Sequence, residues 1–153
     1  MRKNIKVLFF PFVILLFFFN ACTKEDSNTN TNVAGDATGD WTLVSWIENG
    51  TPEDDIAQAD ISISFTNVVN GTGTMTFSST VVPFNYTGNF SIDANDLLTA
   101  TLDETTGEME INQWILSMDA TIGANDLRLE GSILEKSPFW PDNTESTVFE
   151  ATR

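Results

Sequence analysis

The feature that most constrains the fold of this chain is a period-two alternation of apolar and polar residues. It is clearest over residues 84–92, where asparagine, threonine and serine alternate with Phe84, Tyr86, Gly88, Phe90 and Ile92. Such alternation places apolar side chains on one face of a strand, whereas a helix would repeat them every 3.6 residues. The segment is therefore predicted to be a strand with one face in the core.

The same alternation recurs from Gly39 to the end of the chain and predicts eight strands. They lie near residues 40–47, 61–66, 75–77, 84–92, 98–102, 108–118, 127–133 and 147–152. Short turn sequences separate them, among them Asn70-Gly71, a dipeptide typical of two-residue hairpins. The spacing changes near Asn112-Gln113, which indicates a bulge.

One short helix is predicted after the first strand, over Thr51 to Ala59 (TPEDDIAQA). Thr51 is a suitable N-cap, and Pro52 suits the first helical position. The three acidic residues that follow complement the positive end of the helix dipole. The remaining elements are strands, so the chain is predicted to be all-β.

Eight strands joined by short turns favour an antiparallel up-and-down barrel, because closure removes both sheet edges. A two-sheet sandwich is the alternative, but it needs longer crossovers than these turns provide. A membrane-spanning barrel would place its apolar residues outward, on strands of about 9–11 residues. We therefore expect an eight-stranded antiparallel barrel with an apolar interior and one short helix after the first strand.

Residues 1–21 contain the parts of a secretory signal. Basic residues occupy positions 2, 3 and 6, and an uncharged apolar run of 13 residues extends from Val7 to Phe19. A small residue, Ala21, precedes the expected cleavage site. A transmembrane helix is the alternative. At about 1.5 Å per residue the run spans about 20 Å of a roughly 30 Å hydrocarbon core, and Pro11 interrupts it.

Cys22, the only cysteine, follows this segment directly. Ala21-Cys22 resembles the end of the lipobox of bacterial lipoproteins, although Phe19 and Asn20 differ from its usual form. The resemblance implies that Cys22 carries lipid and anchors the mature chain to a membrane, because two or more acyl chains anchor stably at about 0.8 kcal/mol per buried CH₂.

Residues 23–26 (TKED) resemble the export signal of Bacteroidota surface lipoproteins; an ordinary solvated tether is the alternative. The expected location is therefore the outer membrane, with exposure at the cell surface. Residues 22–38 contain only Val33 as a sizeable apolar residue, so they are expected to form a flexible tether. The folded domain is expected to span residues 39–153.

Charge and cysteine content restrict the partners of the domain. Removing residues 1–21 lowers the formal net charge from −15 to −18, because they hold three of the seven basic residues and none of the 22 acidic ones. Such a chain is repelled by phosphate backbones, so nucleic acid is excluded as a partner. With one cysteine, no intramolecular disulfide forms.

The first strand opens with Gly39-Asp40-Trp41, which resembles the Gly-x-Trp sequence at the start of lipocalins. Together with residues 42–46 and Asn49-Gly50, it resembles the lipocalin-like domains of Bacteroidota lipoproteins. The resemblance implies an eight-stranded barrel with a helix or lid after the first strand. It also implies that a late arginine, Arg128 or Arg153, covers Trp41. A second lipoprotein family, the META domain, begins similarly, but its Gly-Cys-Asn motif is absent.

The absence of histidine excludes Ser-His-Asp and Cys-His nucleophiles and histidine-based zinc sites. A glycosidase would need two carboxylates across a cleft, whereas most acids here are predicted in turns or on outward faces. Asp93, Asn95 and Asp96 can supply oxygens to calcium, but we expect them to form a hairpin turn. No enzymatic activity, metal or cofactor is therefore expected.

An eight-stranded barrel either fills its interior with side chains or holds one small ligand. Gly88 and Gly131 are in phase with inward residues, which suggests space for a small hydrophobic ligand, with Tyr86 as its polar contact. The predicted lining is Trp41, Phe65, Phe77, Phe84, Tyr86, Gly88, Phe90, Trp114 and Gly131. The alternative is a filled barrel that acts as a structural or interaction module, accessory to a complex of the cell envelope.

Two aromatic residues, Phe139 and Trp140, stand between Pro138 and Pro141 in the connection before the last strand. They either cap one end of the barrel or form an exposed contact for a ligand or a protein partner. Aromatic side chains on a rigid loop are well suited to binding.

Overall fold

The structure is a computed structural model that describes residues 37–107 and 109–153. The predicted signal segment, Cys22 and residues 23–36 of the tether lie outside the described residues. Within the described ranges, no helix is long and apolar enough to cross a membrane.

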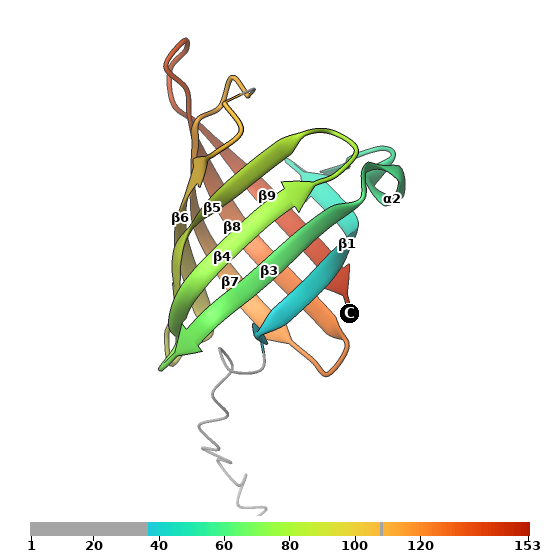
Figure 1. Ribbon diagram of the computed structural model, residues 1–153, viewed down its shortest axis with the longest axis vertical. Helices are drawn as coiled ribbons and strands as arrows, with labels where there is room; N and C mark the ends of the chain where they lie inside the picture. The colour runs from blue at the N-terminus through green and yellow to red at the C-terminus, as the bar shows by residue number, and fades with distance from the viewer. Residues whose placement is uncertain (1–36, 108) are drawn as a thin grey trace, which may run out of the picture.

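The described residues form nine strands, eight of which are long, and the short helix α2 (Figure 1). The elements are β1 (Gly39–Glu48), β2 (Thr51–Pro52), α2 (Ile56–Ala59), β3 (Ile61–Val69), β4 (Thr72–Ser79), β5 (Phe84–Ile92), β6 (Leu97–Glu104), β7 (Gln113–Ile122), β8 (Asp126–Lys136) and β9 (Asn143–Thr152). The long strands pair antiparallel in chain order, and β1 also pairs with β9. The predicted all-β, eight-stranded up-and-down barrel is therefore confirmed.

The alternation seen in the sequence separates the inside of the barrel from its outside. In β5, Phe84, Tyr86, Phe90 and Ile92 are buried, while Asn89 between them is exposed. All the side chains of the predicted lining are buried: Trp41, Phe65, Phe77, Phe84, Tyr86, Phe90 and Trp114. They belong to one hydrophobic cluster that fills the barrel.

One end of the barrel, which we call the closed end, is sealed around Trp41. The indole N–H of Trp41 donates to the carbonyl oxygen of Ala37 at 2.8 Å. The guanidinium carbon of Arg153 lies 4.2 Å from the centroid of the Trp41 ring. Arg153 also donates to the carbonyl oxygens of Ala124 at 2.9 Å and Thr38 at 3.2 Å. Arg153 therefore takes the position that the lipocalin resemblance implied for a late arginine.

Arg128, the other candidate, lies on the outer face of the barrel. Its guanidinium forms ion pairs with Glu130, at 2.9 Å, and with Glu150. Arg128 and Glu150 are directly opposite on β8 and β9, so strand register brings these two charges together.

The helix predicted over 51–59 is shorter than expected. Thr51 and Pro52 form β2, which pairs with the end of β1 through the Asn49-Gly50 turn. Both turn residues have positive φ, 49° and 79°, as a tight hairpin turn requires. Only Ile56–Ala59 is helical. The prediction was wrong at its start, because strand pairing with β1 satisfies the backbone that a longer helix would have used.

The bulge predicted near Asn112-Gln113 is absent, because β7 begins at Gln113 and residues 109–112 belong to the preceding loop. A register shift occurs instead in β1, between Leu43 and Ser45, where Val44 is the additional residue opposite β9. A bulge reverses which residues face inward.

Candidate ligand site at the mouth of the barrel

The space predicted for a ligand at Gly88 and Gly131 is occupied by neighbouring backbone. A Cβ atom at Gly88 would lie 1.9 Å from the carbonyl oxygen of Thr101, and one at Gly131 would lie 2.2 Å from that of Ser117. These glycines therefore allow adjacent strands to approach closely. They do not mark an empty volume, and this part of the prediction is corrected.

Aromatic rings fill the barrel below its other end, which we call the mouth. Trp46 makes edge contacts with Phe77, Trp114 and Phe149, at centroid distances of 5.8, 6.1 and 5.2 Å. Tyr86 stacks on Trp114 at 4.3 Å with an angle of 3° between the rings. These rings pack against one another across the barrel and form the base of its mouth.

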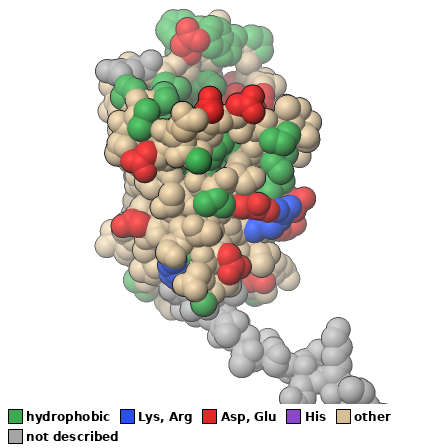
Figure 2. Space-filling view, turned by 90° about the vertical axis from the view of Figure 1, so that its right-hand side faces the viewer, with side chains coloured by type: hydrophobic (Ala, Val, Ile, Leu, Met, Phe, Trp, Pro, Cys, Tyr) green, Lys and Arg blue, Asp and Glu red, His purple; other side chains and the backbone are tan. Residues whose placement is uncertain are grey.

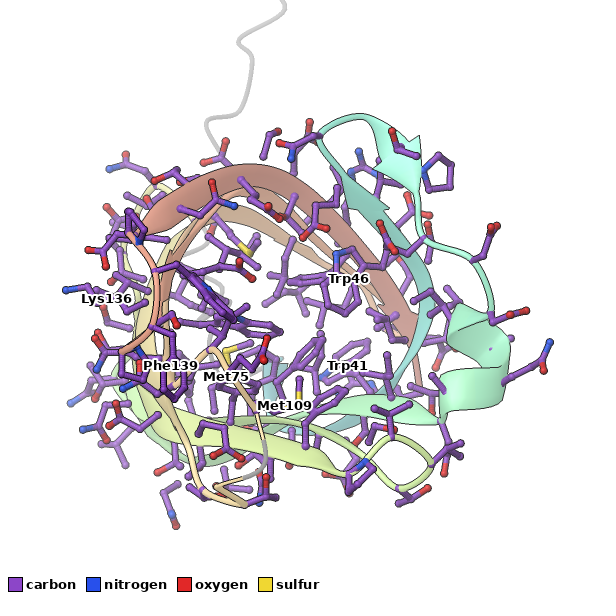
Figure 3. All side chains as sticks on the ribbon, turned by 90° about the horizontal axis from the view of Figure 1, so that it is seen from above. Trp41, Trp46, Met75, Met109, Lys136 and Phe139 are labelled. Carbon is purple, nitrogen blue, oxygen red and sulfur yellow. The ribbon has the colours of Figure 1, made fainter. Side chains whose placement is uncertain are left out.

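Above this base lies the mouth cavity, with a volume of about 350 Å³. Its lining combines aromatic, aliphatic and acidic side chains: Trp46, Glu48, Glu53, Asp54, Ile56, Tyr86, Met109, Ile111, Trp114, Glu135 and Glu145. Figure 3, seen from above, shows Trp46 and Met109 within the outline of the barrel, whereas Lys136 points outward. The mouth is therefore a shallow cup with an aromatic base and an acidic rim.

Three strands bring glutamates to this rim. Glu48 is the last residue of β1, Glu135 lies near the end of β8, and Glu145 lies near the start of β9. Each occupies a strand position whose side chain points into the barrel, and each is partly buried. One carboxylate oxygen from each glutamate lies within 4.8 Å of the others. Closure of β1 onto β9 is what brings them together.

The surroundings of Glu48 favour its protonated form. Burial raises the pKa of Glu48 to about 8, with further contributions from a hydrogen bond shared with Glu145 and from the negative charges of Glu145, Glu135 and Glu53. The first cause is desolvation, and the others are the repulsion expected of carboxylates held together. At neutral pH Glu48 is therefore largely protonated, beside the carboxyl group of Glu145.

Two other groups at the mouth are shifted in the same direction. Burial raises the pKa of Glu135, the charge of Glu145 adds to this, and the indole N–H of Trp114 opposes it. Burial also raises the pKa of Tyr86 to about 12. The Tyr86 hydroxyl donates to the carbonyl oxygen of Ile111 at 2.7 Å, so the predicted polar contact for a ligand is engaged with backbone.

Two indole N–H groups at the mouth are buried without a hydrogen-bond partner, those of Trp46 and Trp114. The Trp114 N–H lies on the side of Glu135, whose pKa it lowers, but it does not reach hydrogen-bond geometry. A buried donor without a partner costs about 1–3 kcal/mol. Buried side-chain donors in native proteins usually have a partner in the protein or in an ordered water molecule.

Two loops rise beside the mouth, one between β6 and β7 and one between β8 and β9 (Figure 1). The Ser137 hydroxyl of the second loop donates to the carbonyl oxygen of Glu110 in the first, at 2.9 Å. Phe139 is 73% exposed and Trp140 is 46% exposed. Figure 2 shows hydrophobic side chains gathered at this end. Of the two roles predicted for this aromatic pair, the structure favours an exposed contact.

Trp140 also borders a smaller cavity of about 230 Å³, together with Met109, Glu110 and Ile111. Met109 and Ile111 line the mouth cavity as well, so the aromatic loop and the mouth adjoin. A larger depression of about 720 Å³ lies along β4 to β7, over outward threonines and serines. No charged side chain lines it, so it offers less for recognition than the mouth does.

The turn predicted at residues 93–96 is confirmed. The Asp93 carboxylate accepts hydrogen bonds from the backbone N–H groups of Asn95, at 2.8 Å, and Leu97, at 3.0 Å. These bonds lower the pKa of Asp93. The carboxylate closes the β5–β6 hairpin, as an aspartate at this turn position commonly does.

The sequence did contain a signal for the mouth that was missed. Trp41 and Leu43 occupy odd-numbered positions and Trp46 an even-numbered one. This change in the alternation marks the bulge at Val44. Glu135 is in phase with Ile133, and Glu145 with Thr147 and Phe149. Acidic residues in the inward phase at strand ends indicate a polar rim.

The likeness to lipocalins therefore consists of the Gly-x-Trp opening, the barrel topology and the arginine over Trp41. No family model, curated protein or solved structure matches the chain.

Proposed function

We propose that this protein is a non-enzymatic, lipocalin-like binding protein of the bacterial cell envelope, and that it holds one small molecule at the mouth of its barrel. The observation that carries the proposal is the mouth cavity of about 350 Å³, which combines an aromatic base with polar groups. Small-molecule sites are typically concave and mostly apolar, with a few converging polar groups.

The filled lumen limits the size of the ligand. Trp46, Phe77 and Trp114 close the barrel beneath the cavity. A long acyl chain or an extended polyene would have no channel to enter, so the ligand is compact. We therefore propose the rim, and not the lumen, as the site of the small hydrophobic ligand expected from the sequence.

The position of the chain entry supports a role at a membrane surface. Ala37 lies at the closed end, where its carbonyl accepts from Trp41. A tether joined there and lipidated at Cys22 would leave the mouth, at the opposite end of the barrel, free of the attachment point. The cavity would then be accessible from the medium around a cell-surface lipoprotein of the outer membrane.

Intrinsic fluorescence tests this proposal on the mature chain carrying Cys22→Ser. The probes are three phenyl compounds of similar size: 2-phenylethanol, 2-phenylethylammonium and 3-phenylpropionate. We expect at least one to change the tryptophan emission saturably in the wild type and in Trp140→Phe, and to change it less in Trp46→Phe, where Trp114 is the remaining tryptophan of the cavity base. Binding of none of the three, or an unchanged response in Trp46→Phe, would contradict a ligand site at the mouth.

A second candidate function is an interaction module, and the exposed pair Phe139 and Trp140 favours it. Exposed aromatic side chains on a loop are frequent anchors of protein interfaces. The test compares cross-linking of the wild type and a Phe139→Ser, Trp140→Ser variant in the envelope of the source cell. A defined adduct that is lost in the variant, while the melting temperature is kept, supports this function; equal adducts oppose it.

A further inference from the structure

We infer that the mouth cavity selects an organic cation, a compound with one ammonium group and a compact apolar body. This inference rests on the proposed function and names its ligand class. It follows from the charge of the rim, the aromatic base and the shape of the cavity, taken together.

The charge at the mouth is not compensated by any basic side chain of the described residues. Five acidic residues line the cavity: Glu48, Glu53, Asp54, Glu135 and Glu145. Residues 37–107 and 109–153 contain three basic residues. Arg128 pairs with glutamates on the outer face, Arg153 covers Trp41 at the closed end, and Lys136 points outward. A cation bound at the rim would relieve the repulsion among these carboxylates.

The base of the cavity suits the apolar body of such a ligand. Trp46, Tyr86 and Trp114 supply aromatic surface, and Ile56 and Met109 supply aliphatic surface. Aromatic rings attract ammonium groups through their quadrupole. Trp114 is only 5% exposed, and its unpartnered N–H lies beside Glu135. That donor has no partner in the fold, and it lies at the wall of the cavity that Glu135 also lines.

A metal ion fits the same cluster less well. One oxygen from each of three glutamates lies within 4.8 Å of the others, whereas calcium takes 6–8 oxygen ligands, so bidentate carboxylates or water would have to complete its shell. The side chains beneath them are Trp46, Tyr86 and Trp114, of which the indoles supply no oxygen and the Tyr86 hydroxyl is bonded to Ile111. The observations therefore favour an organic cation over a bare ion.

Binding of the cation is coupled to a proton. The groups that face the Glu48–Glu145 pair are Glu53 and Asp54 after β2, Tyr86 of β5 and Glu135 of β8, and none is basic. At neutral pH Glu48 holds a proton because its pKa is about 8. An ammonium group replaces that proton, so one cation is bound as one proton is released. Affinity for the cation should therefore rise between pH 6 and pH 8.5.

Isothermal titration calorimetry of the mature Cys22→Ser chain tests the inference with the same three probes. We expect 2-phenylethylammonium to bind at least about tenfold more tightly than 2-phenylethanol at pH 8, and 3-phenylpropionate to bind most weakly. The binding enthalpy of the ammonium compound should depend on the ionisation enthalpy of the buffer, whereas that of the alcohol should not. This measurement needs no variant.

Charge-neutral variants then show which carboxylates strengthen binding of the ammonium compound. Glu145→Gln and Glu48→Gln should each weaken binding of 2-phenylethylammonium about tenfold and leave binding of 2-phenylethanol unchanged. Asp119→Asn removes the same charge from an exposed position on β7, outside the cavity, and should leave both affinities unchanged. Equal losses in Asp119→Asn and Glu145→Gln would overturn the inference, because only the overall charge would then matter.

The outcomes distinguish selection of a cation from the presence of a small-molecule site. If the alcohol binds as tightly as the ammonium compound, selection of a cation is wrong and the small-molecule site stands. If none of the three binds, the site itself is wrong. If calcium chloride binds with one-to-one stoichiometry and prevents binding of the ammonium compound, the rim is a metal site and the inference is overturned.

Discussion

Glu48 shows how the fold changes the chemistry of a single residue. In the sequence Glu48 is one of 22 acidic residues. In the fold its carboxyl group lies against Glu145 inside the rim. Burial and its acidic neighbours raise its pKa from 4.5 to about 8. The folded state therefore binds a proton more tightly than the unfolded state does. The resulting stability is complete below about pH 4.5 and is lost as the pH rises through about 8.

We predict that the thermal unfolding midpoint falls between pH 5 and pH 9, and that Glu48→Gln reduces this fall because glutamine cannot ionise. Circular dichroism melts at both pH values measure the effect. Asp119→Asn, which removes an exposed charge, should show the same fall as the wild type. A full-sized fall in Glu48→Gln would show that this carboxyl group does not couple to folding.

Arg153 is a residue whose role depends on its position over Trp41. It contacts the ring and donates to two backbone carbonyl groups, those of Ala124 and Thr38. We predict that Arg153→Ala lowers the free energy of unfolding by about 1–3 kcal/mol, from the lost cation–π contact and hydrogen bonds. Urea unfolding measures the change.

Arg128→Ala is the matched control for that prediction. Arg128 is 42% exposed and forms surface ion pairs. Pairs of this kind contribute about 0–1 kcal/mol, so the loss should be smaller than for Arg153→Ala. The opposite order would mean that the arginine over Trp41 is not a closing contact.

At the scale of the element, the bulge in β1 decides which residues reach the mouth. Val44 is an extra residue opposite β9 and is 52% exposed. Because of it, Trp41 and Leu43 face inward before the bulge, and Trp46 and Glu48 face inward after it. Without the bulge, the second half of β1 would turn its other face to the core, since one residue reverses the phase of a strand.

We predict that deletion of Val44 destabilises the barrel by more than about 3 kcal/mol, because Trp46 would lose its aromatic contacts. Val44→Thr keeps the bulge and should change stability by less than about 0.5 kcal/mol. Urea unfolding followed by tryptophan emission compares the two variants. A deletion variant as stable as Val44→Thr would show that the bulge does not position Trp46.

Elements were predictable where a local pattern decides them. The alternation in β5 and the Asn70-Gly71 turn matched the structure, because burial of one strand face and hairpin turns act over a few residues. The segment 51–59 was not predictable in this way. Its helical signals were real, but β2 pairs with β1, and tertiary pairing overrode local propensity.

At the scale of the whole molecule, the two ends of the barrel differ in chemistry. Trp41, Arg153 and the incoming chain seal one end, and an acidic cavity with adjoining exposed aromatic residues occupies the other. This polarity suits a domain that is tethered at its closed end. Lipidation of Cys22, which lies outside the described residues, would attach the molecule on the side of this closed end.

We predict that the full-length chain expressed in a bacterial host incorporates labelled palmitate and sediments with membranes. Cys22→Ala should lose both properties, because no thiol remains to carry the acyl chains that provide stable anchoring. The melting temperature of the domain should be unchanged, since Cys22 precedes the barrel. An unlabelled wild-type protein would contradict the lipoprotein prediction.

The sequence by itself determined the fold class and the inward aromatic side chains, and it predicts a signal, a tether and a domain. Each of these follows from patterns that extend over a few neighbouring residues. Only the tertiary structure decided that Glu48, Glu135 and Glu145 meet above Trp46 and Trp114. These residues are distant in the chain, and they come together because β9 closes onto β1 and one bulge in β1 sets the phase of its second half.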